Sequence, residues 1–224
     1  ERRAEILRGL AEVRFLQGNF EEAMAAYSRG LAECRAEGSD REKAAILIGM
    51  SNIHLRRGDL GGATRHCEES LALLQRHPPG REVARAYSCL AQIYYKACDY
   101  TRSISYLGRA MKIVKQQGWQ EELGHVQNNL GLIYRGLGDY REAEKHGRKA
   151  LETFDRIGHC PHIAISQANL GMTLTALGRF REALEGFDRS QRSFRELGDQ
   201  YGFTKTLWGK AEVLRILGDW GAAL

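Results

Sequence analysis

A short motif repeats along this chain with a fixed spacing of 40 residues. It consists of a glycine, an asparagine or aspartate, and then a large apolar residue. The six copies, two of them imperfect, are Gly18-Asn19-Phe20, Gly58-Asp59-Leu60, Cys98-Asp99-Tyr100, Gly138-Asp139-Tyr140, Gly178-Arg179-Phe180 and Gly218-Asp219-Trp220. A constant period of this length indicates an array of similar structural units, each one supersecondary element. The repeat therefore constrains the fold more than any other feature.

Two further sets of small residues divide each unit. One residue lies three positions after each large apolar one: Ala23, Ala63, Ser103, Ala143, Ala183 and Ala223. The second set lies half a period away from the motif, at Gly38, Gly118, Gly158 and Gly198, with Pro78-Pro79-Gly80 in the remaining place. The breaks leave segments that would be about 27 Å long as helices. We expect the small residues to let paired helices approach closely.

The segments have helical rather than strand periodicity. Ala23, Tyr27, Leu31 and Cys34 recur at intervals that place them on one helix face. The polar residue of the motif precedes such a segment, so we predict that it caps the helix that follows. The predicted capping residues are Asn19, Asp59, Asp99 and Asp139.

The charge distribution argues against nucleic acid as a partner. The chain has 33 Lys and Arg against 28 Asp and Glu, giving a net charge of +5 and a pI near 9.0. The two signs are interleaved, as in Arg141-Glu142-Ala143-Glu144-Lys145, which is typical of solvated helix faces. No basic run contains interleaved aromatic residues. No apolar run approaches the ~20 residues needed to cross a membrane, so no membrane association is expected.

Cysteine and histidine patterns indicate no cofactor. The five cysteines form no CxxC pair, which suggests reduced thiols in a cytoplasmic protein. His159-Cys160-Pro161-His162 contains three potential metal ligands, but it lies in an expected loop and lacks a fourth ligand, so no metal is predicted. No phosphate-binding loop, nucleophile elbow or paired-carboxylate cluster is present. We therefore do not expect an enzyme.

The segment Leu130-Gly131, Tyr134, Gly138-Asp139-Tyr140 and Ala143 resembles the signature of the tetratricopeptide repeat family. The 40-residue unit is similar to a subset that includes LGN-type adaptors, bacterial regulators related to the maltose-regulon activator, and Rap-type regulators. Cys98, Arg179 and Gln191 depart from the pattern. The resemblance implies an all-α, right-handed α-solenoid of stacked antiparallel helix hairpins. The repeats would cover approximately 1–38, 39–78, 79–118, 119–158, 159–198 and, in part, 199–224.

The resemblance also implies a concave groove lined by the first helix of each hairpin. The predicted binding residues are Asn52, Arg56, Arg85, Gln92, Tyr95, Lys96, Asn128, Asn129, Arg135 and Asn169, with His125 and Met172 beside them. Asn129 and Asn169 lie one repeat apart, and their amides can donate to and accept from a peptide backbone. Arg85, Lys96 and Arg135 favour an acidic partner. Alternatively, the asparagines form hydrogen bonds between helices, and the cations are ordinary surface charges.

Two function classes follow from this pattern. The first is a non-catalytic scaffold that binds a protein or an extended peptide in the groove. In that case, substituting Asn129 and Asn169 together should abolish partner binding and leave helicity intact. The alternative is a sensor or regulatory domain of a larger bacterial signalling or transcription-regulating protein, which binds a small effector or restrains a neighbouring domain.

The two ends of the sequence suggest a fragment of a longer protein. The chain starts without Met and ends within an expected helix, at Ala222-Ala223-Leu224. Val213, Leu214 and Leu217 would then lack the helix that normally covers them, which makes end-to-end self-association plausible.

Overall fold

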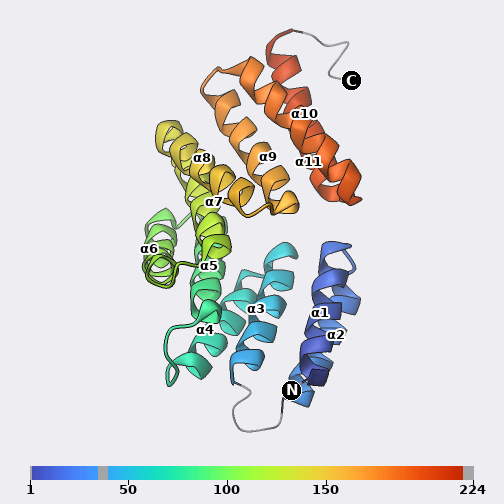
Figure 1. Cartoon of the computed structure of the whole chain (residues 1–224), viewed down its shortest axis with the longest axis vertical. Coiled ribbons are helices and arrows are strands. Elements are labelled where there is room, and N and C mark those ends of the chain that lie inside the picture. Colours follow the sequence, from blue (N-terminus) through green and yellow to red (C-terminus); the bar gives the residue numbers. More distant parts are fainter. Residues whose placement is uncertain (1, 35–39, 219–224) are drawn as a thin grey trace. The chain divides into compact units, whose positions relative to one another are not determined.

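The computed structural model describes residues 2–34 and 40–218, and every regular element in these ranges is an α-helix (Figure 1). The helices are α1 (Arg2–Leu16), α2 (Phe20–Glu33), α3 (Asp40–Arg56), α4 (Leu60–Leu74), α5 (Arg81–Lys96), α6 (Tyr100–Gln117), α7 (Gln120–Gly136), α8 (Tyr140–Arg156), α9 (Cys160–Ala176), α10 (Phe180–Leu197) and α11 (Gln200–Ile216). The predicted all-α class of helix hairpins is confirmed. Gly38, Asp219, Trp220 and Ala223 lie outside the described residues.

The chain divides into two compact units, Glu1–Gln117 and Gly118–Leu224, here named unit 1 and unit 2. Within unit 1 the hairpins are α1–α2, α3–α4 and α5–α6, and within unit 2 they are α7–α8 and α9–α10, followed by α11. The first helices also contact one another in order: α1, α3 and α5 in unit 1, and α7, α9 and α11 in unit 2. One array over residues 1–224 stays a prediction.

The motif glycines form left-handed turns between the helices of a hairpin. Gly18, Gly58 and Gly138 all have a φ of 80°. Cys98 occupies the same motif position and adopts a φ of 59°, although a side chain makes this region unfavourable by about 1 kcal/mol. The turn is therefore kept at this copy of the motif, although cysteine stands in place of glycine.

Side-chain capping follows the aspartates but not Asn19. Asp59 accepts a hydrogen bond from the Gly62 amide at 2.8 Å, and Asp139 accepts one from Glu142 at 3.2 Å. Asp99 does the same for α6, accepting from Arg102 at 3.0 Å. The prediction for Asn19 is wrong, because its side chain makes no hydrogen bond to the first turn of α2. Only its backbone carbonyl is used there, accepting from the Ala23 amide at 3.0 Å.

The small residues of the repeat lie where paired helices are closest. Ala23, Ala63 and Ser103 are fully buried. The Ser103 hydroxyl donates to the Ala91 carbonyl at 2.6 Å, which joins α6 to α5. A Cβ added to Gly131 would lie 3.3 Å from the Ala143 carbonyl oxygen. The close approach predicted from these small residues is confirmed.

The last described helix corrects one expectation. Val213 is fully buried in the core of unit 2, with Phe187 and Leu174, so it does not lack a packing neighbour. Leu217 is 53% exposed, as expected. None of the helices in the described ranges has both the length and the apolarity required to span a membrane.

Candidate functional site

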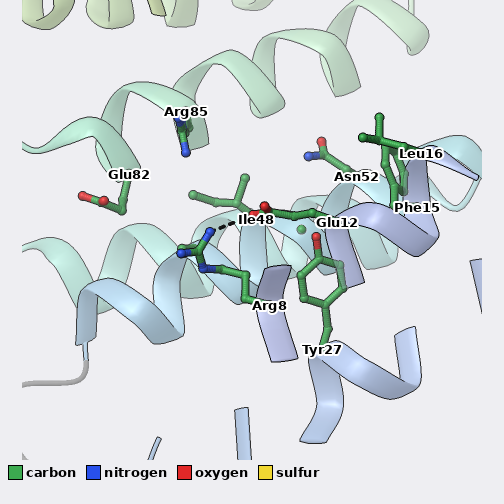
Figure 2. Close-up of a pocket in the computed structure, with 11 residues that line it drawn as sticks. Arg8, Glu12, Phe15, Leu16, Tyr27, Ile48, Asn52, Glu82 and Arg85 are labelled. Atoms are coloured by element: carbon green, nitrogen blue, oxygen red, sulfur yellow. Dashed lines mark hydrogen bonds and ion pairs between the residues drawn. The ribbon is translucent and has the colours of Figure 1, made fainter. Parts of the chain in front are cut away.

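A cavity of about 240 Å³ opens among the first helices of unit 1 (Figure 2). It receives side chains from α1, α2, α3 and α5. Its lining residues are Arg8, Glu12, Phe15, Leu16, Tyr27, Ala45, Ile48, Gly49, Asn52, Glu82 and Arg85. Two predicted groove residues, Asn52 and Arg85, therefore lie around one cavity. We name it the unit 1 cavity.

Opposite charges meet on the walls of the unit 1 cavity. The Arg8 guanidinium binds Glu12 at 2.8 Å and Glu42 at 2.7 Å. Burial lowers the pKa of Arg8, but the two carboxylates outweigh it and raise that pKa overall. Arg85 and Glu82 extend from α5 on the other side in Figure 2. The cavity thus offers both cationic and anionic groups to a bound molecule.

Tyr27 contributes an aromatic ring to the cavity wall. Its side chain is almost completely buried over Gly49, where an added Cβ would overlap the ring. Burial, followed by the nearby Glu12 carboxylate, raises the pKa of the Tyr27 hydroxyl well above its usual range. The hydroxyl therefore stays protonated, and it can both donate and accept hydrogen bonds.

Asn52 also has a partner on α5, and the predicted residues of unit 1 outside the cavity are dispersed. Asn52 accepts a hydrogen bond from the Cys89 thiol at 3.3 Å, and the Arg56 guanidinium lies 5.8 Å from the centre of the Phe15 ring. The centres of the Tyr95 and Tyr100 rings are 5.9 Å apart. Gln92 is half-buried and Lys96 is exposed, both on α5. These side chains line the first helices without forming a second cluster.

In unit 2, the predicted residues bind one another. Asn169 donates from Nδ2 to Asn128 Oδ1 at 3.1 Å, and its Oδ1 accepts from Lys205 at 3.4 Å. Arg135 donates to the Asn169 backbone carbonyl at 3.2 Å. Both Asn129 and Asn169 are only 7% exposed. For Asn169, the alternative of hydrogen bonds between helices is the one observed.

Sequence reasoning missed this burial, although a signal for it existed. Counting back in steps of 40 from Asn169 gives Asn129, Cys89 and Gly49, and all four positions are buried. A small residue at two of the four indicates a packing position. Arg8, Glu12 and Tyr27 were also missed, because no sequence pattern reveals which side chains surround a cavity.

The His159-Cys160-Pro161-His162 segment forms an aromatic cluster with α7 and α8. The centre of the His162 ring lies 4.2 Å from the centre of the His125 ring and 4.3 Å from that of His159. The Phe154 ring stacks on His162, with 4.9 Å between the ring centres. Burial, with His125 and His159 nearby, lowers the pKa of His162 to about 3. In the part of the chain that the structure describes, no three His, Cys, Asp or Glu residues are arranged to hold a metal ion.

Several solved structures share this fold. The protein BtubC (BKLC) from P. vanneervenii is 23% identical, with a TM-score of 0.71 over 91% of this chain and 86% of its own. A Rap protein complexed with Competence and Sporulation Factor is 17% identical, with a TM-score of 0.79 over 99% of this chain and 72% of its own. The signal-transduction ATPase PH0952 from Pyrococcus horikoshii has a tetratricopeptide repeat sensor. It is 16% identical, with a TM-score of 0.68 over 93% of this chain and 32% of its own.

The sequence comparison identifies the family. A search of curated proteins gives no significant match. The tetratricopeptide repeat model, however, matches residues 2–76, 82–156 and 122–196, which together make up most of the chain. This chain belongs to the tetratricopeptide repeat family.

Proposed function

We propose that this chain is a non-catalytic scaffold that binds a protein or an extended peptide through the first helices of its hairpins. The observation that carries the proposal is the unit 1 cavity, where Asn52 and Arg85 surround an open space together with Arg8, Glu12 and Tyr27. Amide, guanidinium, carboxylate and phenol groups together can satisfy both the backbone and the side chains of a peptide. The Rap protein that shares the fold holds a factor in its own structure.

The charges of the cavity refine the proposed preference for an acidic partner. Arg8 already pairs with Glu12 and Glu42, so it adds little net attraction. Arg85 also lines the cavity, and Arg56 and Lys96 lie on the same set of first helices. Because Glu82 lies beside Arg85, the site favours a peptide segment that carries a hydrogen-bond donor next to its own carboxylate.

A charge-matched pair of variants tests the scaffold proposal. Peptides are first selected on the wild-type chain from a random library and then measured by fluorescence anisotropy. Arg85→Glu combined with Asn52→Leu should weaken the selected peptides by at least about tenfold, since a charged and a neutral hydrogen bond are lost. Arg65→Glu, on the exposed face of α4, makes the same charge change away from the cavity and should leave the affinity unchanged. Equal binding to both variants would show that the cavity is not the site.

The buried asparagines are not suitable for this test. Replacing Asn129 and Asn169 would also remove hydrogen bonds that hold α9 to α7 and α11. A loss of binding could then come from local unfolding. Their role in partner binding remains a proposal that needs a stability measurement beside it.

A sensor or regulatory domain is the second candidate function. Two observations favour it: the fold is shared with a protein that has a tetratricopeptide repeat sensor, and the unit 1 cavity is close in size to small-molecule pockets. A thermal-shift screen with charged metabolites should then find a compound that raises the melting temperature of wild type but not of Arg85→Glu. If every stabilising compound acts equally on both proteins, the cavity does not sense a small effector.

We also propose that this chain self-associates through α11. Trp208 is 69% exposed and Leu217 is 53% exposed, so apolar surface is present on this helix. Sedimentation at increasing concentration should show a dimer that Trp208→Glu removes. A monomer at all concentrations would contradict self-association.

A further inference from the structure

Three hairpins place two neighbouring rings at the same repeat position. In each, a ring on the first helix lies against a ring twelve residues later, on the second helix. The distances between ring centres are 5.2 Å for His54 and His66, 5.5 Å for Tyr94 and Tyr106, and 5.3 Å for Tyr134 and His146. The Tyr94 and Tyr134 pairs are stacked, and the His54 pair is tilted by 39°. The second ring therefore has a repeated structural place in the hairpin.

In the fourth hairpin, this ring also satisfies a buried amide. The His146 and Tyr134 rings are nearly parallel, with an interplanar angle of 5°. His146 Nδ1 lies 2.5 Å from Gln127 Oε1, so the imidazole can donate to that oxygen. Stacking and the hydrogen bond together fix the plane and the position of the ring.

The fifth hairpin keeps the amide but has lost both rings. Forty residues after Gln127, Tyr134 and His146 stand Gln167, Leu174 and Gly186. All three line a cavity of about 100 Å³, named here the α8–α10 pocket; its lining residues are Arg148, Leu151, Gln167, Leu170, Gly171, Leu174, Glu182, Glu185, Gly186 and Arg189. Gln167 Oε1 is buried and has no hydrogen-bond partner among the residues that the structure describes.

Packing does not require the glycine that opens this pocket. A Cβ added to Gly186 would meet only the Gln167 carbonyl oxygen, at 3.5 Å, which is an ordinary contact. At Gly171, in contrast, an added Cβ would lie 2.8 Å from the Phe187 ring. Glycine within a helix is unfavourable relative to alanine. Gly186 therefore costs stability without any benefit to the fold, whereas Gly171 is needed by it.

We propose that the α8–α10 pocket receives a tryptophan side chain of a protein partner, whose indole N–H donates to Gln167 Oε1. The indole would take the place that the imidazole of His146 holds one repeat earlier. The pocket is far smaller than pockets for drug-sized molecules, so its size suits one side chain. This site is separate from the unit 1 cavity and does not depend on it.

The residues around the pocket favour an indole over an imidazole. Leu174 is shorter than Tyr134, which leaves room for a two-ring system. Leu151 and Leu170 give the pocket an apolar part, against which the larger apolar surface of an indole can pack. Arg148, Glu182, Glu185 and Arg189 surround the apolar centre with charges of both signs, like the polar rim of a protein interface.

The first test titrates the chain with indole, 1-methylindole and N-acetyltryptophanamide, followed by ¹H–¹⁵N NMR. Indole and N-acetyltryptophanamide should shift amide signals in α8, α9 and α10, with affinities in the millimolar range typical of ligands this small. 1-Methylindole lacks the donor and should bind about tenfold more weakly. Equal binding of 1-methylindole would refute the hydrogen bond to Gln167. Binding of indole without N-acetyltryptophanamide would refute a partner's side chain as the occupant.

The second test fills the pocket from within the chain. Gly186→His should place an imidazole as in the fourth hairpin, raise the melting temperature and abolish indole binding. Gly108→His changes an exposed glycine of α6 with no atom within 4 Å of its added Cβ, and it should leave indole binding intact. Indole shifts that persist in Gly186→His would overturn the proposal. If that variant does not fold, Gln167→Leu replaces it and should weaken indole about tenfold without affecting 1-methylindole.

Discussion

Tyr27 and Gly49 in unit 1 have the same repeat positions as Gly147 and Asn169 in unit 2, but the larger residue is on the opposite helix. In unit 1, the ring from α2 lies over the glycine of α3. In unit 2, the glycine is on α8 and the asparagine is on α9. Phe187 and Gly209 return to the first arrangement, since a Cβ added to Gly209 would lie 2.9 Å from the Phe187 ring. In two places, a ring at one position thus lies over a glycine at the other.

This comparison changes how Asn169 is understood. Asn169 is only 7% exposed, and an amide can fill such a buried position if its hydrogen bonds are met. Asn128 and Lys205 meet them. The equivalent position in unit 1 is Gly49, which borders an open cavity. The same repeat position therefore serves packing in both units, and in unit 1 it also lines a candidate binding site.

The largest expected effect comes from removing the ring of one pair. Phe187→Ala should lower the free energy of unfolding by about 3–5 kcal/mol, because a fully buried ring leaves a cavity over Gly171 and Gly209. Chemical denaturation gives the size of the loss, and hydrogen exchange should show it mainly in α9, α10 and α11. A uniform increase in exchange over α1–α11 would mean that the pairs do not act locally.

Acid should distinguish unit 2 through its histidine cluster. The pKa of folded His162 is about 3, while an unfolded histidine titrates near 6.5, so the unfolded state takes up the proton first as the pH falls. Stability is complete above pH ~6.5 and is lost as the pH falls toward 3, by up to about 2 kcal/mol between pH 7 and 5. The melting temperature of wild type should therefore fall relative to that of His162→Phe as the pH is lowered from 7 to 5. A constant difference between them would contradict this shift.

Two asparagines at different repeat positions compare a packing amide with an amide at the edge of the cavity. Asn169→Ala should cost about 1–2 kcal/mol, because buried polar partners lose their hydrogen bonds. Asn52→Ala, at the edge of the unit 1 cavity, should cost less than about 1 kcal/mol. Urea denaturation of both variants gives the comparison. Equal costs would mean that Asn52 is also a structural residue.

The smallest effects concern helix capping. Asp139→Ala should destabilise the chain by about 1 kcal/mol, since its carboxylate accepts from the Glu142 amide. Asn19→Ala removes a side chain that makes no such bond and should change stability by less than about 0.5 kcal/mol. Thermal melts of the two variants provide the test. A large loss at Asn19 would show that its side chain caps α2 in solution.

The fold was largely predictable because its signals are local. The left-handed glycines, the apolar stripes and the capping aspartates each act within a few residues, and a constant period repeats them. Asn19 shows the limit of such signals, since an amide at a capping position need not cap. Val213 shows another limit, because its burial depends on Phe187, a residue of the preceding helix.

The candidate sites were only partly predictable. Asn52 and Arg85 follow from their places on first helices, but the cavity between them depends on Tyr27, which contacts it from α2. The role of Gly186 could be seen only when Gln167 was found without the donor that Gln127 has in His146. Both features arise from what faces a residue in three dimensions, which a repeat pattern alone does not specify.

The pairing of large and small residues limits how arrays of this kind can change in length. Deleting the 40-residue unit after the first hairpin would place Cys89 where Gly49 now lies, against the Tyr27 ring. Such a deletion would preserve the reading frame and every turn, but it would still create a clash. Joining the first hairpin directly to α11 would instead match Tyr27 with Gly209. Duplication and deletion of hairpins are therefore tolerated only at junctions where a large residue meets a small one. The order of the hairpins is constrained as well as their number.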